Sequence, residues 1–97
     1  MSRKLNNEEI TRQLADLPNW TRPDATDEIH GRFEFEDFVA ALAFVNAVGQ
    51  AAEEMQHHPD IDIRWNKVRL VLSTHSEGGL TQLDVELAHQ IDALAKA

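Results

Sequence analysis

The sequence predicts one α+β domain in which three helices pack on one face of a four-stranded antiparallel sheet. Three segments carry apolar residues at spacings of three and four, which is typical of amphipathic helices. Three others alternate apolar and polar residues, as strands with one buried face do, and a fourth strand is expected near Trp20. Along the chain the order is helix, strand, strand, helix, strand, strand, helix. A chain of 97 residues can bury one core, so we expect residues 1–97 to form a single domain.

The first two strands follow a short N-terminal helix. Asn6 and Asn7 precede two glutamates, which indicates a capping residue and an acidic first turn. The apolar positions of this helix then recur until Pro18, and they are Ile10, Leu14 and Leu17. Residues 21–27 are rich in Asp and contain a proline, which is typical of a turn, so a strand centred near Trp20 should pair with the alternating segment 29–35.

A long helix should begin after Glu36 and Asp37 and end near His57. Its spacing of apolar residues predicts one buried face, made of Phe38, Leu42, Val45, Val48, Ala52 and Met55. We interpret the segments 61–65 and 68–74 as a hairpin that turns at Asn66 and Lys67. A closing helix is expected after the glycine pair at 78 and 79, with its apolar stripe at Leu83, Leu87, Ile91 and Leu94.

The composition excludes several classes of function. Nine Lys and Arg against seventeen Asp and Glu give a net charge of −8, which opposes binding to nucleic acids and to anionic membranes. The chain has no cysteine and therefore no disulfide, thiolate metal site or cysteine nucleophile. The basic N-terminus is followed by no apolar signal segment, and no apolar run is long enough to span a bilayer. We therefore expect a cytoplasmic protein.

Three histidines stand at the ends of predicted elements. His57 and His58 precede Pro59, whose ring disfavours helical geometry in the residue before it, so the two imidazoles should point in different directions. We place His57 in the last turn of the long helix, where the negative end of the helix dipole favours a cation. His75 follows a strand and precedes a glycine-containing loop, a position from which a rigid element can present a side chain. From the pattern alone, all three can equally be polar residues that merely terminate elements.

A long segment resembles the pterin-4a-carbinolamine dehydratase family, and its sequence is EEMQHHPDIDIRWNKVRLVLSTHSEGGLTQLDVELA. The shared features are an acidic residue four positions before the first histidine, the HHP motif, an aromatic-Asn-Lys-Val turn, Ser-Thr-His at the end of a strand, and a Gly-Leu-x-x-x-Asp entry to the last helix. Upstream, the segments NW and FEFEDFVAALAFVNAV are similar to the same family. The resemblance therefore covers nearly the whole chain.

This resemblance implies catalytic roles for His57, His58 and His75. It implies substrate-binding roles for five further residues, which are Glu53, Pro59, Ser73, Thr74 and Asp84. Glu53 lies one helical turn before His57, so it could hold that imidazole or accept a hydrogen bond from an N–H group of the substrate. Asp84 has a second interpretation, because Thr81 and Asp84 have the spacing of a capping box that would close the start of the last helix.

The implied reaction is dehydration of a 4a-hydroxytetrahydropterin to quinonoid dihydropterin and water, as in tetrahydrobiopterin recycling. One acid must protonate the departing hydroxyl and one base must remove a ring-nitrogen proton, and histidine suits both tasks near neutral pH. We assign proton transfer to His58 and His75, and orientation of the substrate to His57, for which a part in acid or base catalysis also stays open. No cofactor or metal is required, since the pterin is the substrate. The resemblance also implies a homodimer or homotetramer and an aromatic amino acid hydroxylase as pathway partner.

Two other functions remain open at this point. The three histidines could supply nitrogen ligands to a metal ion, although the chain has neither an HExxH pair nor a cysteine. The domain could instead be an oligomeric interaction module that stabilises a partner protein, with weak or no catalysis. Val71 supports a subunit contact, because it lies on the opposite side of its strand from Val68, Leu70 and Leu72.

Overall fold

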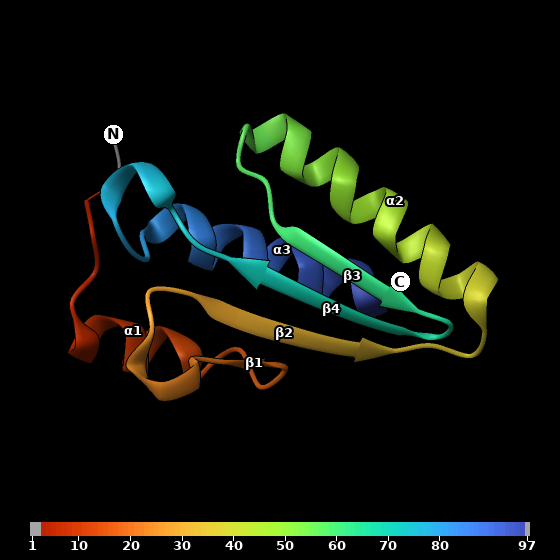
Figure 1. The fold of residues 1–97 in the computed structure, drawn as a ribbon, viewed down its shortest axis with the longest axis horizontal. Helices are drawn as coiled ribbons and strands as arrows, with labels where there is room; N and C mark the ends of the chain where they lie inside the picture. Colours follow the sequence, from red (N-terminus) through yellow and green to blue (C-terminus); the bar gives the residue numbers. More distant parts are fainter. Residues whose placement is uncertain (1–2, 97) are drawn as a thin grey trace.

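The helices and strands follow one another in the predicted order (Figure 1). A computed structural model describes residues 3–96. Its elements are α1 (Asn7–Leu14), β1 (Trp20–Thr21), β2 (Ile29–Glu34), α2 (Phe38–Met55), β3 (Asp60–Arg64), β4 (Lys67–Leu72) and α3 (Gln82–Lys96). Two short 3-10 turns lie between them, η1 (Pro23–Ala25) and η2 (His75–Glu77). The predicted α+β class and element order are thus confirmed.

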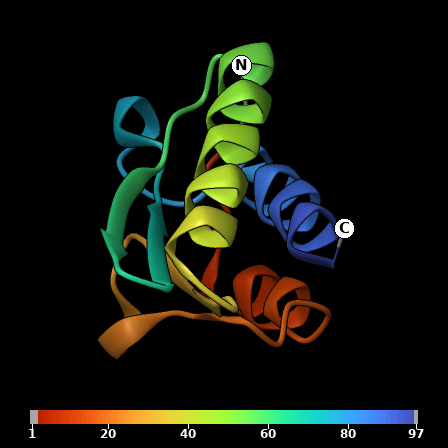
Figure 2. The ribbon, with the colours of Figure 1, turned by 90° about the vertical axis from the view of Figure 1, so that its right-hand side faces the viewer.

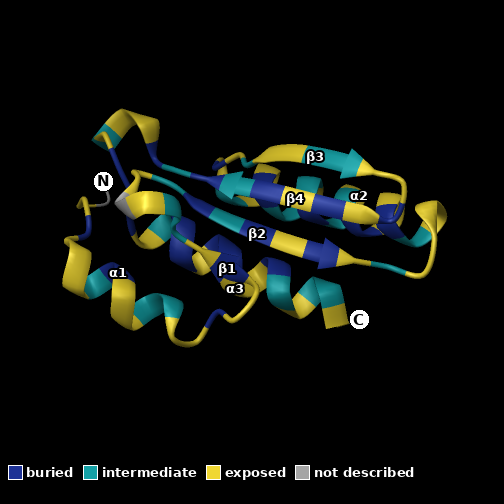
Figure 3. Cartoon of the chain, turned by 60° about the horizontal axis from the view of Figure 1, so that its bottom comes forward, coloured by how far each residue is buried: buried dark blue, intermediate teal, exposed yellow. Residues whose placement is uncertain are grey.

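The four strands form one antiparallel sheet in the order β1-β2-β4-β3. The strand predicted near Trp20 is present but short, and β1 pairs with β2 through Trp20 opposite Gly31. All three helices lie on the same side of the sheet, as Figure 2 shows edge-on. Buried and exposed residues alternate along β2 and β4, so one face of the sheet packs on the core while the other faces outward (Figure 3). Within residues 3–96, no helix has the length and apolar character needed to cross a membrane.

Helix α1 begins with the expected cap. The Asn6 side chain accepts a hydrogen bond from the Glu9 amide at 2.8 Å, and the Glu9 carboxylate accepts one from the Asn6 amide at 2.9 Å. Hydrogen bonds from the Arg3 guanidinium and from the Asn6 amide lower the pKa of Glu9 to about 2. Because this pKa lies below the usual 4.5, the contribution of the cap to stability is present above that pH and is lost as the pH falls towards about 2.

The buried face of α2 differs from the predicted one. The predicted Val48 and Ala52 are buried, but the predicted Phe38 and Leu42 are 44% and 41% exposed. Phe44 is buried instead, and its ring centroid lies 5.1 Å from that of Phe33 and 4.8 Å from that of Phe35. Ala41 and Phe44 form one stripe with Val48 and Ala52, at spacings of three and four residues. Contact with the aromatic rings of the sheet therefore decides which stripe of this largely apolar helix is buried.

The β3–β4 hairpin turns one residue earlier than predicted. Arg64 pairs with Lys67, so the two turn residues are Trp65 and Asn66. Trp65 takes the left-handed conformation with φ of 52°, and its side chain is 67% exposed instead of continuing the buried alternation. The side-chain amide of Asn66 donates a hydrogen bond to the Phe35 carbonyl at 2.9 Å. This link between the hairpin and the end of β2 was not visible in the sequence.

Gly31 allows the close approach of the Trp20 indole to β2. A Cβ at position 31 would lie 2.8 Å from three atoms of the buried Trp20 ring, and Trp20 is held by a 2.8 Å hydrogen bond from its Nε1 to Asp92 Oδ1. We expect Gly31→Ala to lower the free energy of unfolding by about 1–3 kcal/mol, measured by urea denaturation, because the ring must move. Gly49→Ala is the matched control. It lies in α2 with open space around its would-be Cβ, so it should raise stability by about 0.5–1 kcal/mol. Equal effects at both positions would contradict the packing described.

Candidate active site

The end of α2 sets the direction of the paired histidines. Gln56 adopts the left-handed conformation with φ of 52° and caps the helix, and the His57 amide donates back to the Ala52 carbonyl at 3.0 Å. His57 therefore lies outside the helix, and the prediction that it belongs to the last helical turn is wrong. The left-handed residue turns the chain sharply, so His57 and the next histidine leave the helix in different directions.

His57 points into the protein and binds Asp84. Its Nε2 lies 2.6 Å from Asp84 Oδ1, and the two residues are 8% and 0% exposed. They come from the end of α2 and from the first turn of α3, separated by 27 residues in sequence. A buried carboxylate is stable only when it is paired and hydrogen-bonded, so this contact fixes the position of the imidazole.

Two threonines complete the hydrogen bonds of Asp84. Its Oδ2 accepts from the Thr74 hydroxyl at 2.8 Å and from the Thr81 amide at 2.9 Å. The hydroxyl groups of Thr74 and Thr81 are also 2.8 Å apart. Asp84 therefore closes the start of α3, as the capping interpretation predicts, and it also holds His57, whereas its role in binding the substrate stays a prediction. Thr81 was predicted only as a capping residue, although its spacing from Asp84 was the signal that could have placed it in this network.

The same hydrogen bonds indicate which nitrogen of His57 carries a hydrogen. Asp84 already accepts two donors at Oδ2, as expected of an ionised carboxylate, and its Oδ1 then accepts from His57 Nε2. In the neutral imidazole, Nδ1 is consequently the acceptor nitrogen. The buried aspartate thus selects both the orientation and the tautomer of this ring, as in other carboxylate–histidine pairs.

His58 lies on the surface and interacts with Glu53. The Nε2 of His58 and the Oε2 of Glu53 form a hydrogen-bonded ion pair, and the two side chains are 56% and 70% exposed. The sequence suggested that Glu53 could hold His57. Instead the left-handed turn carries His57 away and brings His58 back beside the last turn of α2. A pair this exposed contributes little to stability, so both side chains can rearrange when another molecule binds.

His75 begins η2 and is exposed, directly after the buried Thr74. Two backbone hydrogen bonds join Thr74 and Gly79, at 2.9 and 3.3 Å, and Gly78 adopts φ of 70° between them. This positive φ is favourable for glycine, which explains a glycine at this position. The loop is therefore held by its own backbone, and His75 is one residue away from a direct partner of Asp84.

Two predicted site residues remain, Ser73 and Pro59. Ser73 donates its hydroxyl to the Asp27 carbonyl at 2.8 Å, which ties the end of β4 to the turn before β2. Pro59 is half-buried between His58 and β3. The structure thus joins His57, Thr74 and Asp84 directly and pairs Glu53 with His58. In the described part of the chain, no three His, Asp or Glu side chains are arranged to hold a metal ion.

The family model and the relatives of known sequence agree on one family. The model of the family described as pterin 4 alpha carbinolamine dehydratase matches residues 3–94. A protein of Nocardia farcinica is 54% identical over 92 residues, covering 95% of each chain. A protein of Roseiflexus sp. is 50% identical over 94 residues, covering 97% of this chain and 99% of its own. Both relatives carry the provisional name of pterin-4-alpha-carbinolamine dehydratase.

Solved structures show the same fold. A transcriptional coactivator/pterin dehydratase from Brucella melitensis superposes with a TM-score of 0.91 at 35% identity, covering 95% of this chain and 98% of its own. A pterin dehydratase-like protein identified as a RuBisCO assembly factor in the alpha-carboxysome superposes with a TM-score of 0.69 at 25% identity, covering 81% of this chain and 92% of its own.

Proposed function

The chain belongs to the pterin 4 alpha carbinolamine dehydratase family, and from this premise we propose that it catalyses the dehydration of a 4a-hydroxytetrahydropterin. The products would be quinonoid dihydropterin and water, which makes the protein a hydro-lyase. The match to the family model spans all the residues of the candidate site. We further propose that the reaction takes place in the cytoplasm and recycles the pterin of an aromatic amino acid hydroxylase.

The observation that carries this proposal is the buried hydrogen bond between His57 and Asp84. Burying a carboxylate in a core costs free energy, which its hydrogen bonds must offset. Here the buried carboxylate also holds one imidazole in a fixed orientation. The acceptor Nδ1 of that imidazole suits an N–H group of a flat, polar heterocycle such as a pterin. We therefore assign His57 to orienting the substrate.

His58 and His75 are assigned to proton transfer. One of them protonates the 4a-hydroxyl, the carbon–oxygen bond breaks and water leaves. The other removes a proton from a ring nitrogen, whose electron pair forms the new double bond. One histidine loses a proton and the other gains one, so the pair keeps its total number of protons, and proton exchange between the histidines and solvent restores the starting state. Both side chains are exposed, which allows contact with a substrate and with water.

Decay of the carbinolamine absorbance tests the proposed activity directly. We expect the purified protein to accelerate this decay above the uncatalysed rate, and the acceleration to persist after treatment with a chelator, since the residues of the site suffice for both proton transfers. Metal analysis of the treated sample is the control. A decay no faster than the background would contradict the enzyme proposal, and loss of activity that a metal ion restores would contradict the metal-free mechanism.

A second candidate is an interaction module, acting as a homodimer or homotetramer. It is favoured by the solved structures with a coactivator and an assembly-factor description, and by apolar side chains left exposed on α2 and β3. Val39 is 75% exposed and Ile61 42%, so apolar surface is available for a subunit contact. Val71 is half-buried on the outward face of the sheet, as its position predicts. A chain that forms a larger species in light scattering but accelerates no dehydration would favour this candidate.

A further inference from the structure

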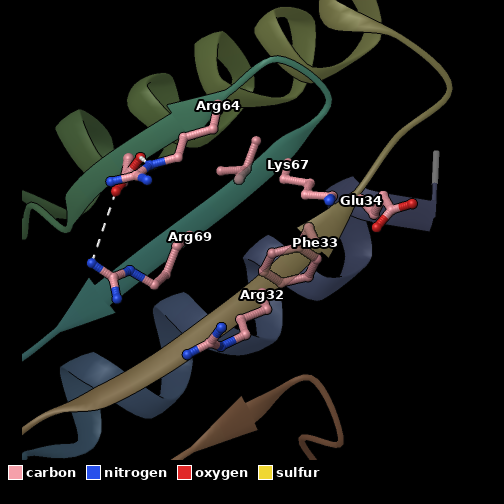
Figure 4. Close-up of a pocket in the computed structure, with 8 residues that line it drawn as sticks. Arg32, Phe33, Glu34, Arg64, Lys67 and Arg69 are labelled. Carbon is pink, nitrogen blue, oxygen red and sulfur yellow. Dashed lines mark hydrogen bonds and ion pairs between the residues drawn. The ribbon is translucent and has the colours of Figure 1, made fainter.

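The outward face of the sheet carries a basic groove in an acidic protein (Figure 4). The groove has a volume of about 610 Å³ and is lined by Arg32, Phe33, Glu34, Asp62, Arg64, Lys67, Val68 and Arg69. Four of the nine basic residues of the chain are among them, with only two of the seventeen acidic ones. The remaining sequence therefore holds five basic and fifteen acidic residues, so the groove has the opposite charge from the rest of the molecule.

The strand register sets like charges against one another in this groove. Arg32 on β2 is directly opposite Arg69 on β4. On the other side of β4, Lys67 is directly opposite Arg64 on β3. Like charges at paired positions on one face of a sheet destabilise the fold. The register also sets Glu34 opposite Lys67 and Asp62 opposite Arg69, so each cation of β4 has one acidic and one basic neighbour. The four cations of the groove therefore exceed its two acids by two charges, and an anion bound between the cations would offset this excess.

Only part of this positive charge is neutralised within the chain. Asp62 Oδ1 lies 3.3 Å from Arg64 Nε, and Asp62 Oδ2 lies 3.8 Å from Arg69 Nη2, the contact drawn dashed in Figure 4. Arg32 and Lys67 have no ion pair with any of the described residues. Both side chains are exposed, so an incoming anion can reach them without disturbing the core.

We propose that this groove binds a short carboxylate-rich segment of a partner protein. The residues that line the groove span three positions on each of three neighbouring strands, 32–34, 62–64 and 67–69, a footprint of roughly 10 Å by 10 Å. Such a footprint matches two or three acidic side chains, and arginine binds carboxylates through paired hydrogen bonds. A long polyanion would extend beyond the groove over a surface with fifteen acidic and five basic residues, which opposes nucleic acid as the ligand.

The groove is separate from the candidate active site. Its residues on β4 are at the start of the strand, beside the β3–β4 turn, whereas Thr74 and His75 follow the other end of the same strand (Figure 1). The groove also opens on the face of the sheet that the helices leave free, while Asp84 is buried in the first turn of α3, which packs on the opposite face. Binding at the groove therefore does not depend on the proposed dehydration, and the two can be tested independently.

Fluorescence anisotropy with a labelled hexaglutamate peptide tests the proposal, with hexaglutamine as the uncharged comparison. We expect hexaglutamate alone to bind, and Arg32→Gln/Lys67→Gln to weaken its binding by about tenfold, because two charge-assisted contacts are lost. The control is Arg12→Gln/Lys96→Gln, which removes the same charge from exposed positions outside the groove and should change binding by less than about twofold.

Three results would overturn the proposal. The first is no binding of hexaglutamate even at about 0.05 M salt, where exposed charges are least screened. The second is equal weakening by the groove variant and by its control, which would indicate a general effect of net charge. The third is tighter binding of a single-stranded oligonucleotide than of hexaglutamate with the same dependence on Arg32 and Lys67, which would assign the groove to nucleic acid. An unchanged midpoint of urea denaturation in the groove variant would show that the protein remains folded, whether or not it has dehydratase activity.

Discussion

Asp84→Ala is expected to lower the free energy of unfolding by about 3–5 kcal/mol. The substitution leaves the Thr81 amide, the Thr74 hydroxyl and the His57 imidazole without their common acceptor in the interior of the protein. A buried donor that loses its partner retains the cost of its desolvation. For a domain of this size, whose whole stability is about 5–15 kcal/mol, the loss is a large fraction, and urea denaturation would measure it.

Glu86→Ala is the matched control for this prediction. Glu86 is an exposed acid in the same helix, so its replacement changes the net charge equally but breaks no hydrogen bond described in the structure. Its effect should stay within about 0.5 kcal/mol. If both variants unfolded at the same urea concentration, Asp84 would not be holding together the segment after α2, the end of β4 and the start of α3 as the structure describes.

Replacement of either proton-transfer histidine is expected to lower kcat by about 100-fold or more. His58→Ala and His75→Ala should each have this effect, since every turnover requires one acid and one base. The free energy of unfolding should change little in both variants, because both side chains are exposed. Decay of the carbinolamine absorbance at several substrate concentrations would separate kcat from KM.

His89→Ala provides the comparison for these two variants. His89 is exposed on α3, outside the candidate site, so its removal should leave kcat unchanged. His57→Ala should behave differently from all three, raising KM and lowering stability, since the orienting ring is buried against Asp84. Full activity in both His58→Ala and His75→Ala would contradict the assignment of proton transfer to these residues.

Asp84 links the fold to the candidate site. The same carboxylate accepts a hydrogen bond from the Thr81 amide, directly before α3, and binds the imidazole that follows α2, so the two helices cannot separate without releasing His57. Thr74 adds the end of β4 to this connection. The site is thus held by three rigid elements, and a loss of stability at Asp84 should be accompanied by a loss of substrate orientation.

Local patterns in the sequence determined the class of the fold and the order of its elements. Alternation in β2 and β4 and the apolar spacing of α3 follow from residues that are near neighbours in the chain, and so does the cap at Asn6. The same reasoning placed three histidines at the ends of elements, and the resemblance to a family supplied their proposed chemistry.

Only the tertiary structure decided matters that depend on contacts distant in sequence. The aromatic rings of Phe33 in β2 and of Phe35 just after it selected the buried stripe of α2. The hydrogen bond from Asn66 to the Phe35 carbonyl accompanies a hairpin turn that begins at Trp65. Above all, the left-handed Gln56 sent His57 to Asp84 and His58 to Glu53. A sequence pattern describes which side of an element a residue occupies, whereas partners separated by 27 residues meet only after the elements have packed.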